Sequence, residues 1–294
     1  MSKKRFLLTF VVILAIALSI VAISVSAIAD KKETLDIAVV TNDADNDLVK
    51  TLQANYNGIS TYSTLDAALD NVGGKGIKGI MVLADKYPGT TVAITDSQAA
   101  KINELGVRVY VEYPANSDAL GITGYSGTKA MDYDRAIVMD SEAMGMEMYS
   151  ILYVHGAQYL KKTDISDSWL VAATVAGYDN VEFYDEETGE LTDCTPYSML
   201  EVNDAGNVLI ASTKLSQFID GKYAPYARWQ SLWMSVISWV AGKDRESINT
   251  VSWTPLVNPN YGPDEELADN AYSEAVRYNN CCRAVLTAAP RYNM

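Results

Sequence analysis

Short apolar runs alternate with segments of helical periodicity in the first part of the chain. Residues 35–40 form an apolar run bounded by charge and by the turn-forming pair Asn42 and Asp43, which predicts a buried first strand. Similar runs at 77–83 and 107–111 predict two more strands. Between the runs, apolar residues recur at helical spacing and predict helices over about 47–56, around 67–69 and over 95–105.

The third of these helices carries the clearest boundary signals. Thr95 and Gln98 have the spacing of a capping box at its start, and Gly106 closes it. Strands separated by helices in this rhythm imply right-handed βαβ crossovers. The sequence therefore predicts an α/β fold with a mostly parallel sheet covered by helices on both faces.

The second half of the chain is richer in strands and ends in a long amphipathic helix. Residues 185–189 read Asp, Glu, Glu, Thr, Gly and suggest the tip of a hairpin between the third and fourth strands predicted in this half. Trp229, Trp233 and their neighbours at helical spacing predict a helix over about 226–241, closed by Gly242, whose aromatic side chains serve packing. The strands predicted in this half are Arg135 to Met139, Ile151 to Val154, Leu170 to Val175, Ser198 to Val202 and Val208 to Ala211.

The N-terminal 29 residues have the layout of an export signal. Lys3, Lys4 and Arg5 precede an uncharged apolar stretch over 6–28 that ends in an A-x-A pattern, as in a secretory signal peptide. The stretch is longer than a usual signal core, so an uncleaved membrane anchor is the alternative. Both interpretations predict an extracellular or cell-surface location, with membrane contact only through this segment.

The other end of the chain is predicted to lie outside the main domain. Residues 243–263 are polar and punctuated by Pro255, Pro259 and Pro263, which marks a linker. A helical pattern starts again at Asp264 and loses its periodicity before Met294. We interpret 264–294 as the truncated start of a helical domain, after an α/β domain over 35–242.

Composition excludes several classes of function. The formal net charge of −14 would repel a polyanion, so we expect no nucleic-acid partner. His155 is the single histidine, which excludes a His-rich metal site, and no cofactor motif is present. The three cysteines, Cys194, Cys281 and Cys282, are too few for a disulfide framework.

Four phrases of the sequence together resemble one family. They are Val82 to Gly89, Gly106 to Pro114, Ile151 to Ala157 and Gly221 to Trp229. As a set they resemble the class I glutamine amidotransferase-like domain that precedes an (α/α)6 glycosidase domain in some bacterial extracellular proteins. The resemblance covers about 35–242, and the tail from Pro263 resembles the opening helix of the glycosidase part.

This resemblance implies a flavodoxin-like sheet and a carbohydrate-processing context, but not amidotransferase activity. That chemistry needs a cysteine on a tight elbow after a strand, activated by a later histidine and an acid. The corresponding region reads Glu112, Tyr113, Pro114, Ala115, and all three cysteines come after His155. We therefore expect no catalytic residues at the nucleophile position.

The candidate ligand residues follow predicted strands. Asp85 and Tyr87 follow the strand at 77–83, and Glu112 and Tyr113 end the strand at 107–111, so all four could line one crevice at the carboxyl edge of the sheet. The alternative is that the tyrosines merely fold over this edge. His155 at a strand end is a further candidate, although a histidine bonded to the backbone explains it better.

An acidic stretch after the first strand suggests calcium at first sight. Asp43, Asp45 and Asp47 have the spacing of an EF-hand loop, but Leu48 and Ala54 replace its glycine and glutamate. Capping of the following helix is the better explanation.

Three functional hypotheses follow. The first is an exported, non-catalytic accessory domain that docks against a glycosidase domain. The second is a carbohydrate-binding module that uses the edge near Asp85 and Glu112. The third, and weakest, is a glycoside hydrolase with these two carboxyls as acid and base, which requires a fixed separation between them.

Overall fold

The computed structural model describes residues 32–43, 45–130, 135–152, 154, 157–173, 195–218 and 226–248. From Thr34 onward they belong to one compact unit. The predicted export segment, the hairpin tip at 185–189 and the predicted helix after Asp264 lie outside the described residues, as do the three cysteines. No helix among the described residues is long and apolar enough to cross a membrane.

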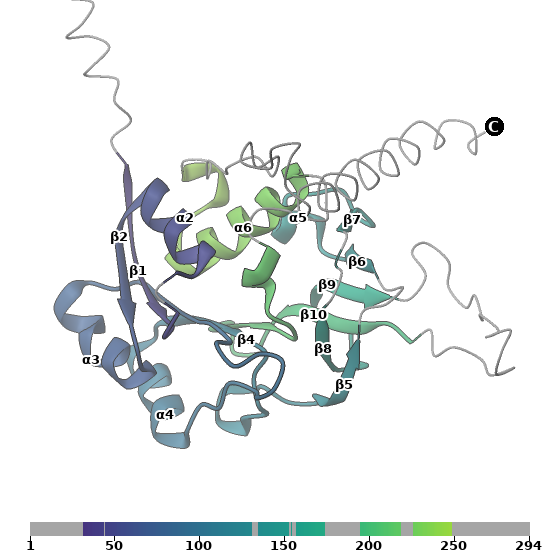
Figure 1. The fold of residues 1–294 in the computed structure, drawn as a ribbon, viewed down its shortest axis with the longest axis horizontal. Helices are drawn as coiled ribbons and strands as arrows, with labels where there is room; N and C mark the ends of the chain where they lie inside the picture. Colours follow the sequence, from purple (N-terminus) through teal and green to yellow (C-terminus); the bar gives the residue numbers. More distant parts are fainter. Residues whose placement is uncertain are drawn as a thin grey trace, which may run out of the picture. The chain divides into compact units, whose positions relative to one another are not determined.

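Within the described ranges, nine strands form one sheet in the order β2-β1-β3-β4-β11-β10-β9-β6-β7. Figure 1 shows β1 and β2 toward one end of this sheet and β6 and β7 toward the other. The strands are β1 (Glu33–Val40), β2 (Tyr56–Tyr62), β3 (Gly79–Val82), β4 (Arg108–Glu112), β6 (Arg135–Val138), β7 (Ile151–Leu152), β9 (Ser168–Ala173), β10 (Tyr197–Val202) and β11 (Val208–Ala211).

One half of the sheet is a doubly wound parallel arrangement. Strands β1, β3, β4 and β11 are parallel neighbours in this order, and the chain passes between them through helices α2 (Asp47–Asn55), α3 (Leu65–Lys75) and α4 (Asp96–Leu105). Together with β2, the strands repeat the 2-1-3-4-5 order of flavodoxin-like sheets. The predicted α/β class with a flavodoxin-like sheet is thus confirmed.

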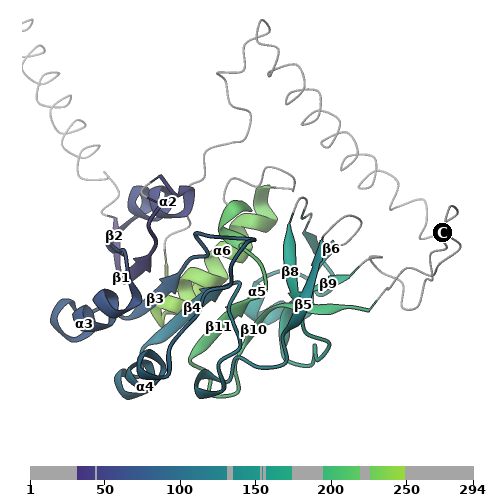
Figure 2. The same ribbon diagram turned by 60° about the horizontal axis from the view of Figure 1, so that its bottom comes forward.

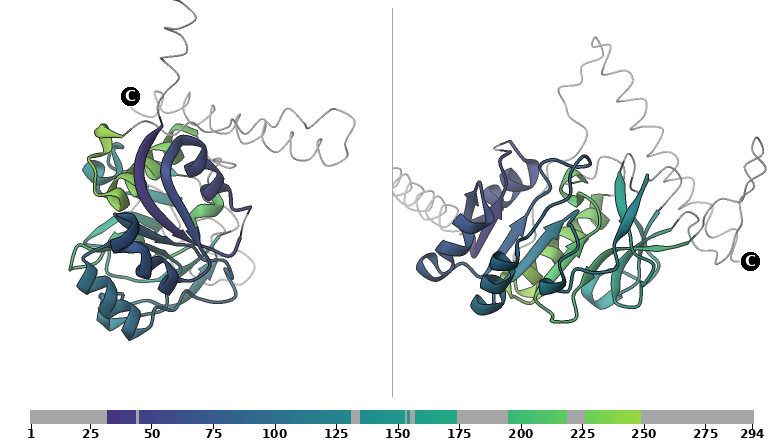
Figure 3. Two further views of the ribbon diagram at one scale, coloured as in Figure 1. Left: turned by 90° about the vertical axis from the view of Figure 1, so that its left-hand side faces the viewer. Right: turned by 90° about the horizontal axis from the view of Figure 1, so that it is seen from below.

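Side-chain alternation along the strands builds two apolar layers. The register aligns Val39, Met81, Tyr110 and Leu209 in one row across the sheet, and this row packs under α2 and α6 (Tyr226–Ala241). The residues one position earlier point the opposite way and pack against α3 and α4. Helices therefore cover both faces, as Figure 3 shows.

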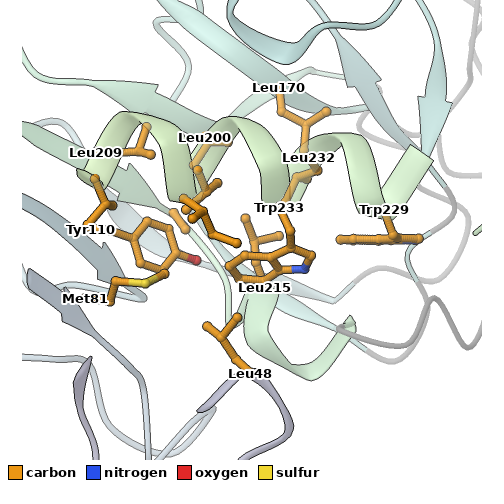
Figure 4. Packing of buried hydrophobic residues seen from close by; sticks show 14 of the residues in the cluster. Leu48, Met81, Tyr110, Leu170, Leu200, Leu209, Leu215, Trp229, Leu232 and Trp233 are labelled. Atoms are coloured by element: carbon orange, nitrogen blue, oxygen red, sulfur yellow. The ribbon is translucent and has the colours of Figure 1, made fainter. Parts of the chain in front are cut away.

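Helix α6 supplies the largest side chains of the first layer. Trp229 and Trp233 are 1% and 0% exposed, and the Trp233 ring meets Tyr110 edge-on, with ring centroids 6.2 Å apart. Figure 4 shows Trp233 near Leu215 and Leu48, and Trp229 farther along the same helix. The prediction that the aromatic side chains of this helix serve packing is confirmed for these two residues.

The C-terminal end of α6 lies very close to the start of β3. A Cβ atom on Gly79 would lie 2.1 Å from the carbonyl oxygen of Val240, so glycine is required there. Arg108 at the start of β4 donates to the Trp239 carbonyl at 2.8 Å and lies over the Trp239 ring. The Trp239 carbonyl also accepts from the backbone N–H of Gly242 at 3.1 Å, and the Arg108 cation lies at the negative end of the helix dipole.

The other half of the sheet is antiparallel, and the helical rhythm of the first half did not predict it. Strands β11, β10, β9, β6 and β7 pair antiparallel in turn. A two-stranded ribbon of β5 (Ser126–Ala130) and β8 (Gln158–Lys161) accompanies them, as Figure 2 shows. The long connection from β4 to β11 therefore contains most of this antiparallel part instead of a crossover helix.

The packed body continues past the predicted start of the linker at Lys243. A short 3-10 helix, η3 (Arg245–Ser247), follows α6, and Ile248 is buried in the first apolar layer. Arg245 donates to Ser231 at 2.6 Å, which ties this segment back to α6.

Candidate functional site

The carboxyl ends of the parallel strands meet at one edge of the sheet, as the sequence analysis expected. Thr41 follows β1, Asp85 follows β3, Glu112 ends β4 and Thr213 follows β11. The first two lie beside each other, because Leu83 donates its backbone N–H to the carbonyl of Val40. Ligand sites of doubly wound sheets lie at this edge.

Of these four residues, Asp85 is the one exposed to solvent, and its carboxylate has a fixed orientation. Oδ1 accepts a hydrogen bond from the Thr41 hydroxyl at 2.6 Å. Oδ2 accepts one from the backbone N–H of Asn42 at 2.6 Å and one from the Asn42 side-chain amide at 3.3 Å. The loop after β1 therefore holds a carboxylate that remains open to solvent.

Glu112 has no exposed surface. Its Oε1 accepts from the Tyr110 hydroxyl at 2.9 Å and from the backbone N–H of Ser216 at 2.7 Å. Its Oε2 accepts from the Ser216 hydroxyl at 2.9 Å and from the backbone N–H of Ala84 at 3.2 Å. Burial raises the pKa of Glu112, and these donors oppose that shift.

The expectation that Glu112 lines an open crevice with Asp85 is therefore wrong. The two residues do come from neighbouring strand ends, since Glu112 binds the N–H of Ala84, directly before Asp85. One carboxyl faces solvent, whereas the other is enclosed and ties the chain after β3 to the short 3-10 helix η2 (Leu215–Phe218). An enclosed carboxyl cannot protonate a glycosidic oxygen, so the geometry does not support the hydrolase hypothesis.

Tyr113 stands at the tight turn after β4, where an amidotransferase would carry its nucleophile. Its backbone φ is 47°, in the left-handed region that non-glycine residues seldom adopt. Its side chain is 2% exposed, and its ring meets the Tyr87 ring edge-on, with centroids 5.1 Å apart. The strained turn exists, but it directs a phenol ring into the core.

Tyr87 is half-buried, and its hydroxyl is already bonded within the protein. It donates to the Gln158 carbonyl at 2.8 Å, accepts from the Gln158 backbone N–H and contacts the Thr213 hydroxyl at 3.2 Å. This arrangement joins the loop after β3 to the start of β8. The two tyrosines thus fold over the edge of the sheet, which was the structural alternative to ligand binding.

Sequence reasoning missed a buried polar network on the antiparallel half. Glu201 accepts from Lys162 at 2.5 Å, from the Tyr125 hydroxyl at 2.8 Å and from the Ser198 hydroxyl at 2.7 Å. Ser168 in turn donates to Ser198 at 2.8 Å. Its members are bonded to one another, so the network is a structural element.

A bulge in β10 creates this network. The pairing of β10 with β9 shifts register on either side of Leu200, so Met199 and Leu200 both join the first apolar layer. Ser198 and Glu201, three positions apart, consequently share the opposite face. A regular strand would have placed them on different faces, which is why a period-two pattern could not reveal the pair.

The acidic loop after β1 is used for local structure. Asn46 caps α2 by accepting from the N–H groups of Leu48 and Val49, Asp43 accepts from the N–H of Asp45, and Asp45 pairs with Lys50 at 3.1 Å. No group of three His, Cys, Asp or Glu among the described residues could hold a metal ion. His155 lies outside the described residues.

Comparisons with known proteins give weak structural similarities. No protein-family model matches the chain, and no curated protein matches it. It is similar to the crystal structure of Agd3, a carbohydrate deacetylase, with 11% identity and a TM-score of 0.39 over 70% of this chain and 32% of that one. It is also similar to a ThuA-like protein from Bacteroides uniformis, with 10% identity and a TM-score of 0.47 over 75% of this chain and 96% of that one. The chain thus spans about a third of the length of the deacetylase.

Proposed function

We propose that this chain is an exported, non-catalytic accessory domain of a carbohydrate-processing protein. The observation that carries the proposal is the turn after β4. A nucleophile at this turn would need an exposed, reactive side chain, whereas Tyr113 is buried against Tyr87. The neighbouring acid, Glu112, is bonded on both oxygens within the protein.

The carbohydrate context rests on the resemblance of residues 35–242 to the amidotransferase-like domain that precedes a glycosidase domain. Export rests on the N-terminal pattern of Lys3, Lys4 and Arg5 followed by an apolar stretch. The partner in this proposal is an (α/α)6 glycosidase domain, whose opening helix the tail resembles.

The proposal is tested by assaying the full chain for glutaminase activity. Glutamine is incubated with the purified protein, and the glutamate formed is measured with a coupled dehydrogenase. We expect no glutamate above the buffer rate. Glutamate formation that scales with protein concentration would overturn the proposal, and Tyr113→Phe would then show whether the turn after β4 takes part.

A second candidate is glycan binding at Asp85, which its fixed and exposed carboxylate favours. A carboxylate oxygen has room for about two hydrogen bonds, and among the described residues Oδ1 of Asp85 accepts one, from Thr41. A sugar hydroxyl could donate to the remaining position. On a glycan array, Asp85→Ala should lose signals that wild type shows, whereas Lys86→Ala, an exposed neighbour, should keep them; wild type without any signal would contradict this candidate.

A further inference from the structure

The strand order of the parallel half reverses between β1 and β3. From β1 the chain moves outward to β2, then returns across β1 and continues through β3 and β4. At such a switch point, the loops that leave the two central strands diverge and create the binding position of doubly wound folds. Phosphate groups commonly bind there to N–H groups of the loop after the first strand.

In this chain the donors of that loop converge on the protein's own Asp85. The Thr41 hydroxyl, the Asn42 backbone N–H and the Asn42 side-chain amide all donate to its carboxylate. The Thr41 bond, at 2.6 Å, has the length of a charge-assisted hydrogen bond from a hydroxyl to a carboxylate. Three donors around one anionic group are the arrangement of an occupied anion site.

The Thr41 hydroxyl is oriented to donate its proton to the Asp85 carboxylate. Its oxygen accepts from the backbone N–H of Asp43 at 3.1 Å, so its single proton is directed to Asp85. Thr41 is itself only 8% exposed, so its side chain has little contact with water. The loop is therefore already arranged around an anion.

We infer that the Asp85 carboxylate fills the anion position at the β1–β3 switch point and closes this edge of the sheet to phosphate-bearing ligands. Nucleotides, flavin mononucleotide and sugar phosphates would compete for the same donors and would meet a fixed negative charge. Exposed Asp43 in the same loop adds to the repulsion. A ligand admitted here must donate hydrogen bonds, as an uncharged hydroxyl does. The inference does not depend on the proposed carbohydrate role.

Removal of the carboxylate should open the site to inorganic phosphate. In Asp85→Ala the three donors lose their acceptor, so phosphate should stabilise this variant. We expect its Tm to rise by about 2 to 4 °C at phosphate several-fold above its Kd, relative to sodium chloride of equal ionic strength. Wild type should show no shift. The double variant Asp43→Ala/Asp85→Ala should respond more strongly, because one repelling charge fewer remains.

Asp43→Ala is the matched control, because it removes one negative charge from the same loop and leaves Asp85 on its donors. If phosphate raised the Tm of this control as much as that of Asp85→Ala, the effect would come from net charge alone. That result would overturn the inference. No response in Asp85→Ala, or an equal response in wild type, would also overturn it. Should Asp85→Ala fail to fold, Asp85→Ser serves in its place, with binding observed as broadening of the phosphate signal in phosphorus NMR.

Discussion

Replacement of Glu112 by glutamine tests the role of the buried carboxyl at the end of β4. The change keeps size and shape, but it replaces one acceptor oxygen by an NH2 group. Each oxygen of Glu112 accepts one backbone N–H, that of Ser216 on Oε1 and that of Ala84 on Oε2. In either orientation of the glutamine, one of these N–H groups therefore loses its acceptor.

The expected cost follows from this loss. A buried donor left without an acceptor costs about 1 to 3 kcal/mol. Protonated Glu112 avoids the cost, because a carboxylic acid hydroxyl still accepts through its oxygen, and the Ser216 and Tyr110 hydroxyls can rotate. At acid pH we therefore expect Glu112→Gln to lose about 1 to 3 kcal/mol of unfolding free energy relative to wild type.

The difference should shrink as pH rises. Burial raises the pKa of Glu112, so the folded wild type binds more protons than the unfolded chain between the unfolded pKa of about 4.3 and the higher folded pKa. Its contribution to stability is present below the unfolded pKa and is lost as pH rises through the folded pKa. Glutamine does not titrate, so the variant lacks this decline.

Urea unfolding of both proteins, followed by circular dichroism from pH 4 to pH 8, measures this difference. Glu104→Gln is the matched control, because Glu104 is exposed on α4, and it should stay close to wild type throughout. A gap between wild type and Glu112→Gln that widens with pH, or no gap at any pH, would refute the reasoning.

Three further substitutions test the packing around the site, each by urea unfolding. Gly79→Ala places a Cβ against the Val240 carbonyl and should cost about 3 kcal/mol; an unchanged midpoint would contradict the close approach. Thr95→Ala removes the capping box of α4 and should cost about 1 kcal/mol of unfolding free energy. Thr95→Ser keeps the hydroxyl and should lose much less. Arg108→Ala loses its bond to the Trp239 carbonyl and its ring contact and should cost about 1 to 2 kcal/mol; Lys, which keeps the charge, should lose less.

The parallel half could be predicted because its signals are local. The run at 35–40, the capping box at Thr95 and the closing Gly106, with φ 61°, appear in the structure as expected. Helix α6 has the predicted bounds of 226 and 241, because its apolar side chains recur at helical spacing over four turns. Periodicity and caps encode such elements without reference to the rest of the chain.

Strand β2 was not predicted from the sequence, because it shows neither the periodicity nor the caps that mark the other elements. Its sequence is largely polar, as is usual for an edge strand with one exposed face. Gly58 interrupts it with φ 75°, opposite Asp36, and a Cβ there would lie 2.6 Å from the Asp36 carboxylate. This distortion depends on the partner strand, which the local sequence does not reveal.

The sequence predicted where the candidate site lies, but not which of its residues are exposed to solvent. Parallel topology brings Asp85 and Glu112 to one edge, as expected. Which of them faces solvent depends on Ser216, which lies more than a hundred positions along the chain and encloses Glu112. Such an arrangement is tertiary, and spacing along the sequence cannot express it.

The most direct test of the central claim is a search for any chemistry on carbohydrate. The full chain is incubated with a mixture of acetylated and unacetylated oligosaccharides, and the mixture is examined by mass spectrometry before and after. If the domain is non-catalytic, the mass of every oligosaccharide should be unchanged. The appearance of shortened or deacetylated products, at a rate proportional to protein concentration, would contradict the account.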